Sequence, residues 1–160
     1  MLNLIILIIS TIGLISLVVF FMWFFNKKRR YEIEYNKGIE SYQENKFEEA
    51  LKFFYKATLI DSGKPDAFYN LGLVYMDMKK NNESKKNFLK ALKLNPDDPD
   101  TYYNLGLLFL NTNKYNDALN QFSKVLQLRS DDAETFYLKG LTLIELKELD
   151  AAIDSLKKAT

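Results

Sequence analysis

A sequence repeat with a period of 34 residues constrains the fold of this chain more than any other feature. Residues 66–75 read DAFYNLGLVY and residues 100–109 read DTYYNLGLLF, so nearly the same ten residues occur twice, 34 positions apart. Four glycines keep the same spacing: Gly38, Gly72, Gly106 and Gly140. A fixed period of roughly 20 to 50 residues is typical of proteins that stack similar structural units, since one unit alone cannot bury its apolar face.

Each 34-residue unit is predicted to contain two helices. Two apolar stripes at i, i+3, i+4 spacing mark two amphipathic helices per unit. In the second unit we expect them at about residues 66–78 and 81–94, separated by the polar turn KKNN. The small residues Gly72 and Ser84 allow the two helices of this unit to approach closely, and bulky residues such as Phe88 fill the space between units.

Further positions repeat with the glycines. A small residue follows each glycine after twelve positions, and a bulky residue follows four positions later; these are Ala50, Ser84, Ala118 and Ala152, then Phe54, Phe88, Phe122 and Leu156. Pro96 closes the second unit. The pattern resembles the tetratricopeptide repeat, a 34-residue helix–turn–helix unit with G, A-x3-F and P at these places. The resemblance implies an all-α solenoid of about four repeats: residues 31–64, 65–98, 99–132 and a truncated 133–160 without a capping helix.

The first 25 residues differ from the repeats. Residues 2–25 contain no charge and no proline, and as a helix they would extend about 36 Å, enough to cross a hydrocarbon core of about 30 Å. A cleaved signal peptide is the alternative, but no basic residue precedes this run, and bulky residues rather than a small-residue cleavage site end it. We therefore predict a transmembrane helix at residues 1–25 and a basic juxtamembrane linker at residues 26–30.

Four basic residues set the predicted orientation. Lys27, Lys28, Arg29 and Arg30 directly follow the apolar run, and the positive-inside rule then predicts an outside N-terminus and cytoplasmic repeats. The same four side chains are expected to contact anionic headgroups at the membrane surface. Abundant Lys, Asn and Ile suggest an AT-rich genome, so we predict a single-pass protein of a bacterial inner membrane. The alternative is the same scaffold facing the extracytoplasmic side.

Composition argues against several functions. The chain has no cysteine and no histidine, which removes disulfides, thiolate zinc sites and the commonest general base. Beyond residue 30 it carries 18 basic and 21 acidic residues, a poor match for nucleic acid. We predict no enzymatic activity, no metal, no cofactor and no nucleic-acid partner.

The resemblance also implies a binding groove, because the first helix of each tetratricopeptide repeat lines a concave surface. The expected groove residues are Tyr35, Asn36, Tyr69, Asn70, Leu73, Tyr103, Asn104, Leu107 and Tyr137. Asparagine amides can donate to and accept from a peptide backbone, and tyrosines supply rigid contact area. The alternative interpretation is structural, since these residue types are common in the family at these positions. The acidic residues Glu32, Asp66, Asp100 and Glu134 suit helix N-termini.

The expected groove residues argue against one function that some relatives perform, the binding of an acidic peptide tail. A carboxylate clamp for the acidic tail of a heat-shock chaperone needs lysine and asparagine where this chain has Tyr35 and Ile39. We expect instead a membrane-anchored scaffold or adaptor for a protein partner, bound as an extended peptide or helix. The sequence does not identify that partner.

The last helix suggests a second function. We expect no closing polar helix after the last one, so Leu149, Ile153 and Leu156 would lack a neighbour that covers them. Such an end either tolerates some exposure or serves as a docking surface. Terminal repeats ordinarily carry a polar outer face. The alternative to an adaptor is therefore a structural membrane component that self-associates into a homo-oligomer through these residues.

Overall fold

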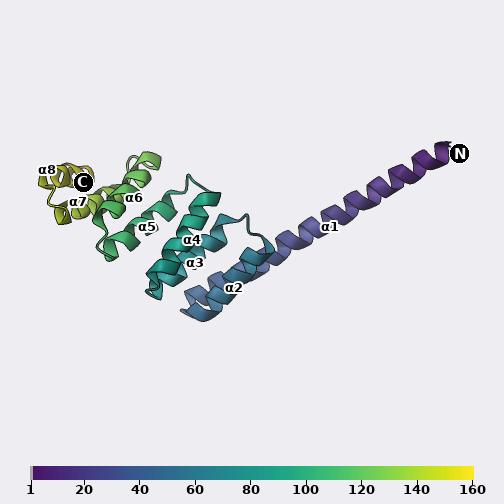
Figure 1. Cartoon of the computed structure of the whole chain (residues 1–160), viewed down its shortest axis with the longest axis horizontal. Helices are drawn as coiled ribbons and strands as arrows, with labels where there is room; N and C mark the ends of the chain where they lie inside the picture. Colours follow the sequence, from purple (N-terminus) through teal and green to yellow (C-terminus); the bar gives the residue numbers. More distant parts are fainter. Residues whose placement is uncertain (1) are drawn as a thin grey trace. The chain divides into compact units, whose positions relative to one another are not determined.

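The structure, a computed structural model, describes the backbone of residues 2–160 and the side chains of residues 13–160. Over these residues the chain is all-helical, with eight helices and no strand, which confirms the predicted helical class (Figure 1). The helices are α1 Leu2–Gln43, α2 Phe47–Ile60, α3 Pro65–Asp77, α4 Asn81–Leu94, α5 Pro99–Asn111, α6 Tyr115–Leu128, α7 Ala133–Glu145 and α8 Leu149–Lys158. They form two units, Met1–Ser62 and Gly63–Thr160.

The first unit is a helical hairpin made of α1 and α2. The predicted anchor, the linker and the first helix of the first repeat are one continuous helix of 42 residues. Gly38 allows the close approach of α2, because a Cβ atom at this position would lie 2.6 Å from the ring of Phe54. Lys27 adds an ion pair to Asp61, 3.3 Å away at the end of α2. Glycine and phenylalanine therefore define the hairpin, and the ion pair lies at its open end.

The second unit contains three helix pairs, α3 with α4, α5 with α6, and α7 with α8 (Figure 1). In each pair a glycine of the first helix faces a bulky side chain of the second. A Cβ atom would lie 2.5 Å from Phe88 at Gly72, and 2.7 Å from Leu156 at Gly140. The Ser84 hydroxyl also donates a hydrogen bond of 2.8 Å to the Gly72 carbonyl. The small residues thus let the helices pack closely, as the sequence predicted.

Neighbouring pairs share one hydrophobic core. Phe88 and Leu92 of α4 cluster with Leu105, Leu108 and Phe109 of α5 and with Ala118 and Phe122 of α6. Phe88 therefore packs against Gly72 inside its own repeat and against the next repeat as well. This double contact explains why a single repeat is not an independent core.

The turn inside each repeat has the same backbone geometry. A residue with positive φ stands at every 34th position, and these residues are Asn45, Lys79, Asn113 and Lys147. In the second repeat the Lys80 N–H donates to the Tyr75 carbonyl at 2.8 Å and the Lys79 N–H to the Met76 carbonyl at 2.9 Å. This is the Schellman pattern that ends many helices, usually with glycine at the left-handed residue.

The predicted membrane localisation is wrong. Among the residues searched, those that the structure describes, no helix is long and apolar enough to cross a membrane. The part of the predicted anchor at residues 1–12 lies outside the described side chains. The predictions of an outside N-terminus and of cytoplasmic repeats were derived from this anchor, so they lose their basis as well.

Candidate peptide-binding groove

The candidate groove of the second unit is formed by residues of its three first helices, α3, α5 and α7. Tyr69, Leu73 and Leu107 are partly buried and pack against the shared core cluster. Leu73 and Leu107 therefore have a structural role on one side and a partly exposed surface on the other. Because they stand on helices that pack against one another, their positions are fixed by the fold rather than by a flexible loop.

The groove tyrosines rest on the core phenylalanines. The Tyr69 ring lies 6.0 Å from the Phe88 ring, centroid to centroid, and the Tyr103 ring lies 6.4 Å from the Phe122 ring. Tyr137 differs, because the equivalent core residue on α8 is Leu156. Its side chain is 51% exposed. Two of the three tyrosines are thus supported by rings beneath them, and the third is available to solvent.

Side-chain hydrogen bonds link the three helices across the groove. The Asn104 amide of α5 donates to the Tyr69 hydroxyl of α3 at 3.0 Å. The Tyr103 hydroxyl of α5 donates to the Glu134 carboxylate of α7 at 2.7 Å. Each link joins position five of one repeat to position six or two of the next. We call Tyr69, Asn104, Tyr103 and Glu134 the polar belt; its bonds hold these side chains in defined orientations before any ligand is bound.

The asparagines also bind their own helices. The Asn70 amide donates to the Asp66 carbonyl and the Asn104 amide to the Asp100 carbonyl, both at 2.9 Å. Asn70 is only 7% exposed. Both asparagines therefore form a hydrogen bond within their own helix, which is the structural role that the sequence offered as the alternative to peptide binding.

Carboxylates give the edge of the candidate groove a negative charge. Asp66, Asp100 and Glu134 are exposed and stand in the first turns of α3, α5 and α7, where the helix dipole favours them. Asp100 also pairs with Arg129, at 2.8 Å. Burial, followed by the hydrogen bond to Glu134 and nearby negative charge, raises the pKa of Tyr103. Tyr103 therefore remains a hydrogen-bond donor at neutral pH.

The remaining expected groove residues belong to the first unit. Tyr35 is partly buried, stacks on Tyr31 with centroids 5.6 Å apart, and packs on Phe54 at 5.8 Å. Asn36 is exposed on the same helix. Tyr35 therefore repeats the arrangement of Tyr69 and Tyr103, a groove tyrosine resting on a core phenylalanine.

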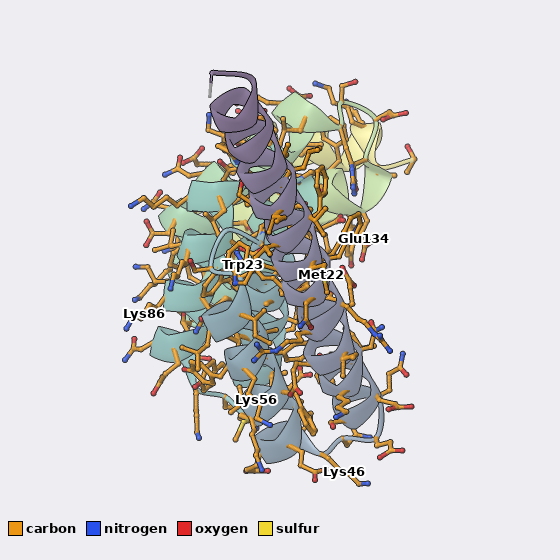
Figure 2. All side chains as sticks on the ribbon, turned by 90° about the vertical axis from the view of Figure 1, so that its right-hand side faces the viewer. Met22, Trp23, Lys46, Lys56, Lys86 and Glu134 are labelled. Carbon is orange, nitrogen blue, oxygen red and sulfur yellow. The ribbon has the colours of Figure 1, made fainter. Side chains whose placement is uncertain are left out.

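The four basic residues of the first unit lie in different environments. Lys27 pairs with Asp61, and its ammonium lies 6.0 Å from the ring of Trp23, while Lys28 and Arg29 are exposed. Met22 and Trp23 themselves are exposed on α1 (Figure 2). Arg30 lines a cavity between α1 and α2 that was not expected from the sequence.

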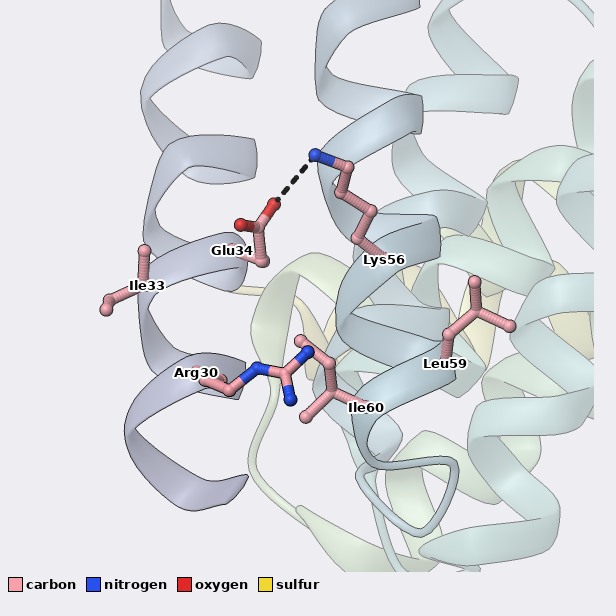
Figure 3. A pocket seen from close by; sticks show the side chains of 6 residues that line it. All are labelled: Arg30, Ile33, Glu34, Lys56, Leu59 and Ile60. Atoms are coloured by element: carbon pink, nitrogen blue, oxygen red, sulfur yellow. Dashed lines mark ion pairs between the residues drawn. The ribbon is translucent and has the colours of Figure 1, made fainter. Parts of the chain in front are cut away.

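That cavity, of about 380 Å³, combines charged and apolar side chains (Figure 3). Its lining residues are Arg30, Ile33, Glu34, Lys56, Leu59 and Ile60. The Lys56 ammonium lies 3.5 Å from the Glu34 carboxylate across it. Glu34 stands where the later repeats carry the aromatic residues Phe68, Tyr102 and Phe136, and this departure was the available sequence signal.

The three residues expected to mediate self-association are not equivalent. Leu149 and Ile153 of α8 are 61% and 51% exposed. Leu156 is partly buried, because it occupies the space beside Gly140 inside the last repeat. Leu156 is thus part of the repeat's own packing.

A basic hollow at the repeat turns was also missed. Lys79, Lys80, Lys85 and Lys114 line a cavity of about 380 Å³ with Phe109 and neighbouring polar residues. Lys85 places its ammonium 5.2 Å from the Phe109 ring. The signal in the sequence was a lysine at the sixteenth position of the first three repeats.

Comparison with solved structures supports the fold. MamA aligns with a TM-score of 0.78 at 21% identity, over 81% of this chain and 75% of that one. MamA from Desulfovibrio magneticus RS-1 aligns with a TM-score of 0.77 at 24% identity, over 81% of this chain and 73% of that one. Pseudomonas aeruginosa pilF aligns with a TM-score of 0.74 at 20% identity, over 84% of this chain and 61% of that one.

Sequence comparison gives the family. No curated protein sequence matches the chain significantly. Family models do match: one described as TPR repeat covers residues 38–79 and 74–113, and two described as tetratricopeptide repeat cover residues 99–132 and 133–160. Together they extend without a gap from residue 38 to residue 160, over the same residues whose helix pairs, glycine contacts and turns repeat every 34 positions. The chain belongs to the tetratricopeptide repeat family.

Proposed function

We propose that this chain is a protein-binding scaffold that holds a segment of a partner protein against α3, α5 and α7. Proteins of the tetratricopeptide repeat family generally serve as scaffolds rather than enzymes, and we propose the same here. The segment would be an extended peptide or a helix. Its contact surface would consist of Tyr69, Tyr103 and Tyr137 together with the partly exposed Leu73 and Leu107.

The polar belt is the observation that carries this proposal. The bonds from Asn104 to Tyr69 and from Tyr103 to Glu134 fix aromatic side chains that would otherwise lose rotamer freedom on binding. Binding to a preorganised surface is stronger because this entropy has already been lost during folding. Tyrosine is also enriched among the residues that contribute most to protein interfaces.

The charge of the groove edge indicates the kind of segment. Asp66, Asp100 and Glu134 are exposed beside the tyrosines, and only Asp100 forms a salt bridge within the described residues. These carboxylates would attract lysine and arginine side chains and repel an acidic tail. We therefore propose a partner segment that combines apolar or aromatic residues with basic ones.

The test is direct binding of designed peptides to the full chain. Two peptides share aromatic and aliphatic residues and differ only in lysine or glutamate at the remaining positions. Fluorescence anisotropy gives the Kd of each peptide for the wild type and for a Tyr69→Ala, Tyr103→Ala variant. We expect the lysine peptide to bind at least tenfold more tightly than the glutamate peptide. The Tyr69→Ala, Tyr103→Ala variant should bind the lysine peptide about tenfold or more weakly than the wild type does, as expected for aromatic hot spots.

Leu89→Ala provides the matched control, because Leu89 is 47% exposed on α4, outside the candidate groove. This variant should bind like the wild type. Equal binding of both peptides would contradict the proposed charge preference. An unchanged Kd in the double tyrosine variant, with helicity preserved, would exclude the groove as the binding site.

A further inference from the structure

The basic hollow lies between the second and third repeats, at the end of the helix pairs where their turns stand. Lys79 and Lys80 belong to the turn between α3 and α4, Lys85 to α4, and Lys114 to the turn between α5 and α6. Phe109 of α5 lines the same hollow, and its ring lies 5.2 Å from the Lys85 ammonium. All of these residues belong to the second unit, so the packing of the repeats fixes their backbone positions relative to one another.

The second repeat departs from the repeat pattern on the side of α4 that lines this hollow. Its 17th and 21st positions carry Asn81 and Lys85, and both residues line the hollow. The other three repeats carry large apolar side chains at these positions, namely Phe47, Tyr115 and Leu149, and Leu51, Leu119 and Ile153. Polar groups at a contact between repeats cost desolvation that apolar groups do not. Packing between repeats therefore does not account for these two residues, whereas binding of a charged ligand does.

The ammonium groups around the hollow have no acidic partner inside the chain. Lys79, Lys80 and Lys114 are exposed, and Lys85 is partly buried. Within the residues that the structure describes, none of the four forms a salt bridge, and Glu83 is the one carboxylate that lines the hollow. Four like charges around one hollow repel one another, and negative groups placed among them would remove this repulsion.

The first repeat shows the same lysine with a partner. Lys46 stands at the position of Lys80 and Lys114, and its ammonium lies 2.7 Å from the Glu44 carboxylate. Neither the second nor the third repeat carries a carboxylate in place of Glu44. Lys80 and Lys114 thus lack the neighbouring acid that pairs with Lys46, and a carboxylate of another molecule can take its place.

The next hollow along the turns is not basic. It has a volume of about 240 Å³, lies between the third and fourth repeats, and has Lys114 and Asp117 as its charged lining residues. Tyr115 stands there at the position of Asn81. Because the two hollows occupy equivalent places in the fold, the repeat architecture does not by itself require the excess of lysine in the basic hollow.

We propose that the basic hollow binds an acidic segment of a partner protein, with aspartate and glutamate carboxylates placed among the ammonium groups of its four lysines. The Asn81 and Asn82 amides beside them can donate to and accept from the backbone of that segment. No arginine is among the described residues that line the hollow, so the forked contact that favours phosphate groups is absent. A nucleic acid would need a basic surface extended along its phosphates, whereas the neighbouring hollow is neutral.

This surface is separate from the candidate groove. The groove edge carries Asp66 and Asp100 in the first turns of α3 and α5, whereas the hollow lies at the other end of these helices, which are about 20 Å long. The two surfaces share no residue and have opposite charge. Each would therefore take a different segment, and binding in the hollow does not depend on the function proposed for the groove.

The experiment is fluorescence anisotropy of the full chain with a short peptide of glutamate and serine residues that carries a neutral dye. A second peptide has glutamine in place of every glutamate and should bind at least about tenfold more weakly. Lys80→Gln, Lys85→Gln should weaken binding of the glutamate peptide by about tenfold, because half of the attractive charges are lost. Lys79→Gln, Lys114→Gln changes only exposed side chains and should give a similar loss, so the result does not depend on the partly buried Lys85.

Lys86→Gln, Lys93→Gln is the charge-matched control. Both lysines are exposed on α4 and neither lines the hollow; Lys86 is labelled in Figure 2. This variant should bind the glutamate peptide like the wild type, and circular dichroism should show equal helicity for all variants. The Tyr69→Ala, Tyr103→Ala variant should also bind it like the wild type, which distinguishes the hollow from the candidate groove.

Four results would each overturn the proposal. They are equal binding of the glutamate and glutamine peptides, an equal loss in the control variant and in the hollow variants, displacement of the peptide by millimolar inorganic phosphate at constant ionic strength, and tighter binding of a single-stranded oligonucleotide. Displacement by phosphate would indicate a site for small anions, and tighter binding of the oligonucleotide would indicate a nucleic-acid surface.

Discussion

The third repeat, α5 with α6, and the last repeat, α7 with α8, are built alike and yet lie in different environments. Each has a glycine facing a bulky side chain, at Gly106 with Phe122 and at Gly140 with Leu156. Phe122 is completely buried, whereas Leu156 is only partly buried. The motif forms the same helical hairpin in both repeats, but among the described residues only the third repeat contacts a helix pair on both sides.

This difference separates two contributions to stability. Contacts within a repeat follow from its own sequence and are present in every unit. Contacts between repeats depend on a neighbour, and within the described part of the chain the fourth repeat contacts one only on its N-terminal side. In solenoids, stability is approximately the sum of these two kinds of contribution. Substitutions at equivalent positions of the two repeats measure them separately.

The largest difference is expected at the bulky core position. Phe122→Ala should lower the free energy of unfolding by about 3–5 kcal/mol, because it opens a cavity in a completely buried site. Leu156→Ala should cost about 2 kcal/mol, since this side chain is partly exposed and belongs to one repeat. Urea unfolding followed by circular dichroism measures both. Equal losses would show that the inner repeat gains nothing from its second neighbour.

The facing glycines should give the next effect. Gly106→Ala places a Cβ atom 2.6 Å from the ring of Phe122, which is enclosed and cannot move aside, so we expect a loss of about 2–3 kcal/mol. Gly140→Ala meets Leu156, whose flexible end can shift toward solvent, and about 1 kcal/mol should be lost. Thermal unfolding of both variants compares them. A larger loss at Gly140 would contradict the explanation from enclosure.

The turns should show no difference between an inner and the last repeat. Lys79 and Lys147 both adopt positive φ, of 58° and 63°, a conformation that is unfavourable for residues with a Cβ atom. Lys79→Gly and Lys147→Gly should each stabilise the chain by about 1 kcal/mol, because the strain is local and independent of neighbours. Urea unfolding checks this, with the exposed Lys86→Gly, in the middle of a helix, as a destabilising control. Unequal gains would mean that neighbours also restrain the turn.

The smallest effect is expected at Ile153, which is 51% exposed on α8. In dilute solution Ile153→Ser should change stability by about 0.5 kcal/mol or less, as exposed sites usually do. Leu119→Ser, at the equivalent and partly buried position of the third repeat, should cost about 1 kcal/mol or more. Thermal unfolding at low micromolar concentration compares the two. A large loss for Ile153→Ser would show that Ile153 supports the fold of its own repeat despite its exposure.

The repeat architecture was predictable because its signal is periodic and local. Helices expected at residues 66–78 and 81–94 are α3 Pro65–Asp77 and α4 Asn81–Leu94, within one residue at each end. The spacing of apolar residues, glycines and polar turns indicates which sides of a helix pair are buried and which are exposed. Both are largely determined by residues within the same 34-residue repeat. Hydropathy alone was less reliable, since it predicted a membrane helix that the described residues do not contain.

By itself, the sequence determined the helical hairpins, their close packing at the glycines and the polar turns between their helices. Only the tertiary structure decided which equivalent positions differ in environment. It joined Asn104 to Tyr69 across 35 positions of sequence, and placed Leu156 in the core of its own repeat while leaving Ile153 exposed. The physical reason is that periodicity describes which side of a helix is apolar, whereas burial and pairing depend on which neighbouring helix is present to cover that side.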